Sequence, residues 1–190
     1  MSKYILYIGN DLAHKSNYNS SMETLSTLLI KEKYQVKKSS SKKNKVNRLL
    51  EMCFSVVKNR NKVDYILIDT FSTINFYYAF IISQLARILN IKYIPILHGG
   101  DLPQRIDRSK RMSNLIFNHS DINIAPSNYL KNEFEKRSYT TKFIPNILEI
   151  DKYDFKRRKS LSPKVLWVRA FRHLYNPKLA IEVLVLLKKQ

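Results

Sequence analysis

The stretch Tyr93-Ile94-Pro95-Ile96-Leu97-His98-Gly99-Gly100-Asp101 decides how the rest of the chain is interpreted. An apolar run that is typical of a buried parallel strand ends here in a histidine, two glycines and an aspartate. Ligands of open α/β sheets bind outside the carboxyl ends of the strands, so this polar, glycine-containing strand end indicates a functional loop. The alternative is a tight strand-to-helix turn that Asp101 caps and in which His98 is only hydrogen-bonded.

The composition indicates a folded chain that is attracted to polyanions. The 190 residues are 44% hydrophobic, which is enough for a core, and 34 Lys and Arg against 15 Asp and Glu give a formal charge of +19. This charge favours nucleic acid or an anionic lipid surface as a partner. Cys53 is the single cysteine, so an internal disulfide and a cysteine zinc site are excluded, and a reducing cytoplasm fits. The apolar stretch 71–89 is interrupted by polar residues and is typical of a buried helix rather than a membrane span.

Strand-like and helix-like segments alternate from the start of the chain to about residue 145. Strands are predicted at 3–8, 34–37, 63–69, 91–97, 121–125 and 142–145. Helices are predicted at 21–29, 46–57, from a cap at Thr70 and Ser72 to Leu89, at 104–119 and at 127–137. A basic loop is predicted at 37–45. This alternation predicts an α/β fold built on a Rossmann-like, doubly wound parallel sheet.

The alternation breaks at a charged segment and then restarts. Residues 149–162 carry Lys156-Arg157-Arg158-Lys159 and are interpreted as a linker. A strand at 165–168 and a helix at 177–188 follow. A single strand and helix cannot form a core of their own, so we expect residues 163–190 to be an incomplete second Rossmann-like domain after a first domain at 1–148.

Several short motifs in the second half of the chain occur in a recognisable order. They are Ala125-Pro126-Ser127-Asn128-Tyr129-Leu130, Ile144-Pro145-Asn146, Asp151-Lys152-Tyr153, Val165-Leu166-Trp167-Val168-Arg169 and Asn176-Pro177-Lys178-Leu179-Ala180-Ile181. Together they resemble family 4 glycosyltransferases of the GT-B fold, over most of residues 90–190. The resemblance implies a retaining glycosyltransferase that moves a sugar from a nucleotide sugar to a lipid-linked or oligosaccharide acceptor in cell-surface polysaccharide or lipopolysaccharide biosynthesis.

The resemblance also implies roles for the parts of the chain. Residues 1–148 correspond to the acceptor-binding domain, and residues 163–190 to the first strand and helix of the donor-binding domain. We therefore expect the chain to be a fragment that is inactive alone, or a subunit that awaits a partner chain carrying the donor half. The expected location is cytoplasmic, peripheral on the inner face of the cell membrane.

The resemblance and the strand ends together identify eight candidate site residues. Those expected to be catalytic are His98 and Asp101, those expected to bind the acceptor are Gly99, Gly100 and Asn10, and those expected to bind the donor phosphates are Gly9, Arg169 and Asn176. The four histidines have no acidic pair at ligand spacing, so no metal site and no cofactor are expected. Without a metal, arginine side chains and helix N-termini have to stabilise the negative charge of the donor phosphates.

The chain departs from the family pattern at both donor positions. A glycine-rich loop usually follows the first strand, whereas here Gly9 is followed by Asn10 and Asp11. A lysine-glycine pair usually follows the arginine, and Leu174 or Tyr175 stands in its place. Simpler readings are that Arg169 is a surface arginine at a strand end and that Asn176 only caps a helix.

Basic clusters at 37–45, 58–62 and 105–111 all fall in the first domain. They favour docking on an anionic membrane, with a generally lysine-rich, solvated surface as the alternative. Two other classes of function stay open: a non-catalytic subunit that binds acceptor or membrane, and a nucleic-acid-binding protein. No nucleic-acid-binding signature accompanies the charge, so a specific nucleic-acid partner is not expected.

Overall fold

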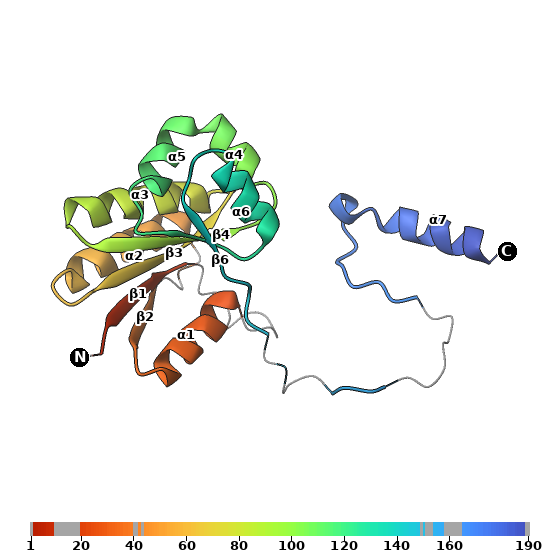
Figure 1. The fold of residues 1–190 in the computed structure, drawn as a ribbon, viewed down its shortest axis with the longest axis horizontal. Coiled ribbons are helices and arrows are strands. Elements are labelled where there is room, and N and C mark those ends of the chain that lie inside the picture. The colour runs from red at the N-terminus through yellow and green to blue at the C-terminus, as the bar shows by residue number, and fades with distance from the viewer. Residues whose placement is uncertain are drawn as a thin grey trace. The chain divides into compact units, whose positions relative to one another are not determined.

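The structure is a computed structural model that describes residues 2–9, 20–39, 42, 44–148, 150, 154–157 and 165–188. The chain divides into two compact units, Met1–Leu148 and Glu149–Gln190 (Figure 1). The first unit contains the sheet and all of the clustered core residues.

A six-stranded, all-parallel sheet forms the centre of the first unit, which confirms the predicted α/β, doubly wound class. Its strands are β1 (Tyr4–Ile8), β2 (Gln35–Ser39), β3 (Tyr65–Phe71), β4 (Lys92–His98), β5 (Asn123–Ala125) and β6 (Thr141–Phe143). The order across the sheet is β2-β1-β3-β4-β5-β6. The direction of winding therefore changes between β1 and β3, the point at which such sheets bind ligands.

The helices of this unit begin where the sequence offers caps. They are α1 (Ser21–Lys31), α2 (Lys45–Asn59), α3 (Asn75–Ile88), α4 (Leu102–Arg108), α5 (Lys110–Phe117) and α6 (Asn128–Glu135). The Ser20 hydroxyl accepts a hydrogen bond from the Glu23 backbone N–H, and Ser127 does the same for Leu130. Such side-chain caps satisfy N–H groups that the first helical turn leaves free.

Alternate residues of each strand pack into different layers of the core. In β1 and β3, Leu6, Ile8, Ile66 and Ile68 pack in a cluster with residues of α2 and α3. On the opposite face, Ile5, Tyr7 and Leu67 pack with Met22 of α1. Figure 1 shows α1 on the lower side of the sheet in this view, and α3, α4 and α5 on the upper side.

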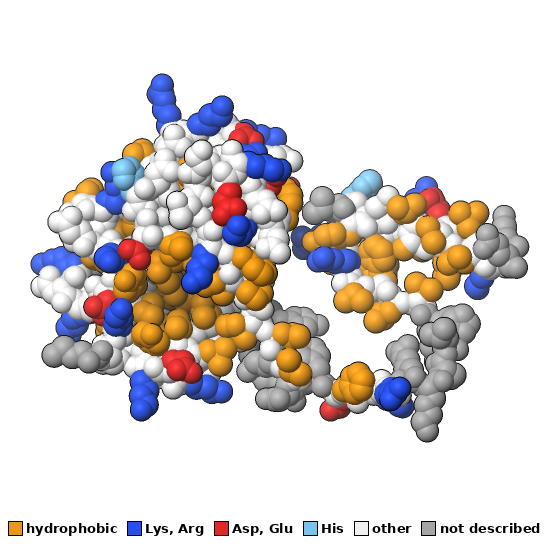
Figure 2. Space-filling model, in the orientation of Figure 1, with side chains coloured by type: hydrophobic (Ala, Val, Ile, Leu, Met, Phe, Trp, Pro, Cys, Tyr) orange, Lys and Arg blue, Asp and Glu red, His pale blue; other side chains and the backbone are white. Residues whose placement is uncertain are grey.

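The face that α1 shares is only partly covered by the described residues. A groove of about 350 Å³ opens on it, lined mainly by apolar side chains of α1 and of the strands, including Leu25, Leu67, Ile94 and Ile124. Figure 2 shows apolar side chains gathered in the lower half of the first unit, where Figure 1 has α1 and the adjoining part of the sheet.

Four local predictions differ from the structure. The expected helix at 104–119 is two helices, α4 and α5, separated at Ser109, whose φ of −132° and ψ of 43° are not helical. A continuous helix would place Ile106 and Ile116 about 80° apart around its axis. The break at Ser109 changes the direction of the chain between these two residues, and the side chains of Ile106 and Ile116 are both buried.

The other three differences concern strands: where two of them end, and whether a third exists. Thr70 is buried within β3 and caps no helix, because β3 continues alongside β4 until Phe71 pairs with His98. Residues 37–39 belong to β2 rather than to the basic loop, since they pair with the end of β1. Residues 165–168 are not a strand; a strand needs a hydrogen-bonded neighbour, and the described part of the second unit contains none.

The second unit contains a short 3₁₀ turn, η3 (His173–Tyr175), and one helix, α7 (Pro177–Leu187). Asn176 precedes α7 in the left-handed conformation, with a φ of 46°, and its side chain accepts a hydrogen bond from the Leu179 N–H at 3.4 Å. In the described part of the chain, no helix is both long enough and apolar enough to traverse a bilayer.

Candidate functional site

The carboxyl-terminal edge of the sheet brings together polar side chains from three neighbouring strands. His98 is the last residue of β4, and its Nε2 lies 2.9 Å from Oδ1 of Asp69 on β3. The hydroxyl of Tyr7, on β1, donates to the same carboxylate oxygen at 3.0 Å. The His98 ring also stacks on Phe71, with centroids 4.5 Å apart and planes 15° from parallel. The strand register therefore builds a Tyr7–Asp69–His98 cluster at the switch point of the sheet.

The chemistry of this cluster determines which groups donate. The hydroxyl of Tyr7 stays protonated, because burial and then the nearby Asp69 charge raise the pKa of Tyr7 well above its usual value. An ionised carboxylate only accepts hydrogen bonds, so Nε2 of His98 carries the hydrogen that Asp69 accepts. The other ring nitrogen, Nδ1, is then the unprotonated one in a neutral imidazole. His98 is thereby prepared to accept a proton from a ligand.

Gly9, which follows β1, lies directly against Asp69. A Cβ placed on Gly9 would come within 3.0 Å of Asp69 Cγ and 3.2 Å of Asp69 Cβ, and closer still to Oδ2. The backbone N–H of Gly9 donates to the Ser39 carbonyl oxygen at 2.8 Å, which holds this turn in place. The glycine predicted to bind donor phosphates is thus also the residue that leaves space for the Asp69 carboxylate.

A pocket of about 160 Å³ opens beside His98 on the α1 side of the sheet. Its polar lining residues are Tyr7, Ser21, Thr24, His98 and Asn146. Its apolar lining comes from Leu25, Ile96, Ile124, Pro126, Ile144, Pro145 and Ile147. Drug-sized ligands occupy pockets of about 300–1,000 Å³, so this one suits a smaller group such as a single sugar residue.

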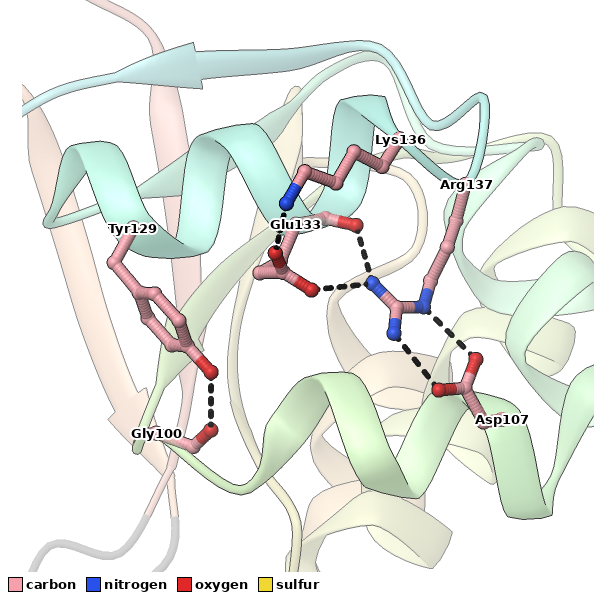
Figure 3. Close-up of polar contacts among 6 residues, drawn as sticks. All are labelled: Gly100, Asp107, Tyr129, Glu133, Lys136 and Arg137. Atoms are coloured by element: carbon pink, nitrogen blue, oxygen red, sulfur yellow. Dashed lines mark hydrogen bonds and ion pairs between the residues drawn. The ribbon is translucent and has the colours of Figure 1, made fainter.

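The loop after His98 is held by the neighbouring helix α6. Gly99 has a φ of 84°, which favours glycine, and no atom would contact a Cβ on Gly99 or Gly100 within 4 Å. Tyr129 of α6 donates to the Gly100 carbonyl oxygen at 3.4 Å (Figure 3). Arg137, just after α6, makes two hydrogen bonds of 2.8 Å to Asp107 of α4 (Figure 3).

This second contact is charge-assisted and bidentate. The Arg137 hydrogen bonds hold the pKa of Asp107 below its usual value, and the hydrogen bonds of Lys136 and Arg137 do the same for the pKa of Glu133. The ion pairs thus link α6 to α4, the two helices that lie on either side of the Gly99–Asp101 loop in the fold.

Asp101 occupies a different place from the one expected. It is exposed and makes no side-chain hydrogen bond to cap α4. It lines a separate pocket with Ser72, Gln104, Arg105 and Arg108, and it is not in the lining of the His98 pocket. Its predicted catalytic role stays a prediction.

The remaining predicted residues are distributed over the chain. Asn10 lies outside the described residues. Arg169 and Asn176 belong to the second unit: the Arg169 guanidinium lies 5.4 Å from the Tyr175 ring centre, and Asn176 caps α7. Among the residues that the structure describes, no group of three or more His, Cys, Asp or Glu side chains is arranged to hold a metal ion.

Sequence reasoning missed Asp69 and Tyr7. Asp69 lies within an apolar strand, and for such a position a strand-flanking or core residue is the simplest interpretation. The signal that identifies Asp69 is its position near the carboxyl end of β3. This strand precedes β4, which ends in His98, and pairs with it. Tyr7 carries no such signal, since a tyrosine inside a strand is usually part of the core.

No protein-family model matches the chain, and no curated protein matches it. The functional argument therefore depends on the residues and on their geometry.

Proposed function

We propose that this chain is the acceptor-binding part of a glycosyltransferase, in which the His98 pocket receives the sugar that is to be extended. The observation that carries the proposal is that His98, hydrogen-bonded to Asp69, borders a small pocket at the carboxyl-terminal edge of a doubly wound sheet. A retaining, GT-B-type transfer from a nucleotide sugar, without a metal, is the reaction that the sequence motifs favour.

In this proposal the acceptor oxygen bonds to the donor sugar on the face from which the diphosphate departs, the bond between sugar and phosphate breaks, and His98 accepts the proton of the acceptor hydroxyl. Asp69 holds the ring with Nδ1 unprotonated and stabilises the imidazolium that forms, while Tyr7 anchors Asp69. Gly99 and Gly100 shape the loop beside the pocket. In the second unit, Arg169 and the Asn176-capped helix are the proposed contacts of the donor diphosphate.

Replacing His98 tests the acceptor pocket. The ¹⁵N-labelled chain would be titrated with neutral methyl glycosides of glucose, galactose and N-acetylglucosamine, and amide shifts at Gly99 and Gly100 would be followed by NMR. We expect at least one glycoside to bind, and His98→Ala to weaken it about tenfold, which is about 1.4 kcal/mol.

The matched control is His119→Ala, because His119 is exposed and lies outside the lining of the His98 pocket. Equal binding by the two variants would refute the assignment of the pocket. A non-catalytic binding subunit would show the same sugar binding, and the chain alone is expected to be inactive in either case. Transfer of radiolabelled sugar from nucleotide sugars to extracted lipids is therefore assayed with the donor-binding half supplied: a catalytic His98 predicts that His98→Ala abolishes transfer even at saturating acceptor, whereas a residue that only binds the acceptor predicts that saturation restores it.

The surface of α2 supports an anionic membrane as a partner. Four apolar side chains at helical spacing are exposed on this helix: Val46, Leu50, Phe54 and Val57. Exposed basic side chains occur at both ends of the helix, at Lys45 and at Lys58, Arg60 and Lys62. An apolar stripe with basic ends is typical of a helix that lies in the interface of an anionic bilayer.

Flotation with vesicles tests the proposed membrane surface. The chain is expected to bind phosphatidylglycerol vesicles and not phosphatidylcholine vesicles, and the double variant Leu50→Ser/Phe54→Ser is expected to lose most of this binding while it stays folded. The matched control is Ile81→Ser/Ile88→Ser on α3, where the two side chains are also exposed. Binding that the two double variants reduce equally would rule out α2 as the membrane surface.

A further inference from the structure

A second pocket lies at the same carboxyl-terminal edge of the sheet as His98. It has a volume of about 220 Å³ and is lined by Ser72, Asp101, Gln104, Arg105 and Arg108. Ser72 directly follows β3 and Asp101 precedes α4. The pocket therefore lies where two neighbouring strands end, a position that favours ligand binding in this class of sheet.

Arg105 is held in this pocket by aromatic rings. Its guanidinium carbon lies 4.8 Å from the ring centre of Phe76 and 4.7 Å from that of Tyr77, both on α3. These contacts favour a cation and fix the position of the planar group. The guanidinium is thus ordered without any carboxylate partner among the described residues.

Two nitrogens of Arg105, Nε and Nη2, are buried and donate to no acceptor in the described protein. An N–H group that is removed from water without an acceptor is destabilising, and more so when the group is charged. Protein structures rarely leave such groups unsatisfied without a functional reason. Here the missing partner is an acceptor, since a guanidinium has no hydrogen-bond role other than donor.

The lining determines the charge of that acceptor. Arg105 and Arg108 contribute two positive charges and Asp101 one negative charge, which leaves the pocket with a net positive charge. Ser72 and Gln104 add neutral donors. A compact anion with several acceptor oxygens satisfies this combination, and the planar fork of arginine matches a phosphate in two-point contact.

We propose that this pocket is a phosphate-binding site, with Arg105 as its principal residue and Arg108 as a second ligand. The site is distinct from the His98 pocket, so the proposal does not depend on sugar binding there. The phosphate can belong to a soluble molecule or to a diphosphate-bearing lipid. If the proposed glycosyltransferase function holds, the second source is an acceptor whose phosphate is bound beside its sugar.

Binding of inorganic diphosphate, measured by isothermal titration calorimetry on the full chain, tests the proposal. Arg105→Gln is expected to weaken binding at least tenfold and Arg108→Gln severalfold, whereas Asp101→Asn is expected to strengthen it because a like charge is removed. The matched control is Arg111→Gln, which removes the same charge from an exposed residue of α5 outside the pocket and should change the affinity less than twofold.

Arg108→Gln leaves the aromatic contacts of Arg105 intact, so it keeps the test valid if Arg105→Gln does not fold. The absence of diphosphate binding, or equal losses in the Arg105, Arg108 and Arg111 variants, would overturn the proposal.

A vesicle assay then separates the two sources. Phosphatidylcholine vesicles that contain a polyprenyl diphosphate would be compared with phosphatidylcholine alone. Retention that depends on Arg105 supports a lipid headgroup, and binding of free diphosphate without such retention supports a soluble phosphate ligand. Failure of methyl glycosides to bind would count against the His98 pocket alone and leave this result unchanged.

Discussion

Gly9→Ala is expected to lower the free energy of unfolding by about 2 kcal/mol, although it adds only one methyl group. The new Cβ would lie 3.2 Å from Cβ of Asp69 and closer still to the carboxylate oxygen. Rotation of the carboxylate cannot relieve this contact fully, because Cβ of Asp69 is attached directly to the backbone of β3. Either the strand must shift or Asp69 must move away from His98.

The measurement is urea unfolding of the full chain, followed by circular dichroism. Gly100→Ala is the matched control, since a Cβ at Gly100 meets no atom within 4 Å, and its effect should stay within about 0.5 kcal/mol. The signals of the His98 ring nitrogens should change in the Gly9 variant and not in the control. If the two variants were equally stable, the close packing of Gly9 against Asp69 would be wrong.

The strands and helices of the first unit could be predicted because each one carries its own local pattern. β4 appears as an apolar run, and α2 as apolar residues recurring at helical spacing. Asn90 ends α3 in the left-handed conformation, with a φ of 54°, which asparagine tolerates better than most residues. Alternation of these elements was sufficient to predict the parallel sheet.

The features that were missed depend on contacts between distant segments. The division between α4 and α5 at Ser109 follows from how both helices bury their apolar side chains, and periodicity within one segment does not show this. The expected strand at 165–168 has suitable residues, but a strand forms only with a neighbour. Local pattern thus predicts the type of an element better than its ends or its partners.

The structure places His98 at the strand end expected from the sequence and adds two polar neighbours that the sequence did not indicate. His98 follows from sequence because it ends a buried strand. Asp69 and Tyr7 depend on the alignment of three strands: Ile8 opposite Ile68, and Phe71 opposite His98. A shift of one residue in either pairing would turn the polar groups to opposite faces, and a single sequence does not specify that register.

Asp69→Ala is expected to destabilise the chain by about 2–3 kcal/mol, because it leaves the buried Tyr7 hydroxyl without an acceptor and removes the partner of His98. A double-mutant cycle with Tyr7→Phe gives a sharper test than the single variant. In the natural chain, Tyr7→Phe removes a hydrogen-bond donor from the carboxylate of Asp69, whose side chain is only 9% exposed. It should therefore lower the free energy of unfolding by about 1–2 kcal/mol. In the Asp69→Ala background the same substitution removes an unsatisfied hydroxyl, so it should stabilise the chain.

The sign of the Tyr7→Phe effect should therefore reverse between the two backgrounds. Asp64→Ala provides the control, because Asp64 accepts the Tyr4 backbone N–H at 2.7 Å and has no contact with the Tyr7 hydroxyl, so its effect and that of Tyr7→Phe should add. If Tyr7→Phe cost the same with and without Asp69, the three groups would not act as a unit. Reversal would show that Tyr7 stabilises the chain by holding Asp69, the arrangement that the proposed role of His98 requires.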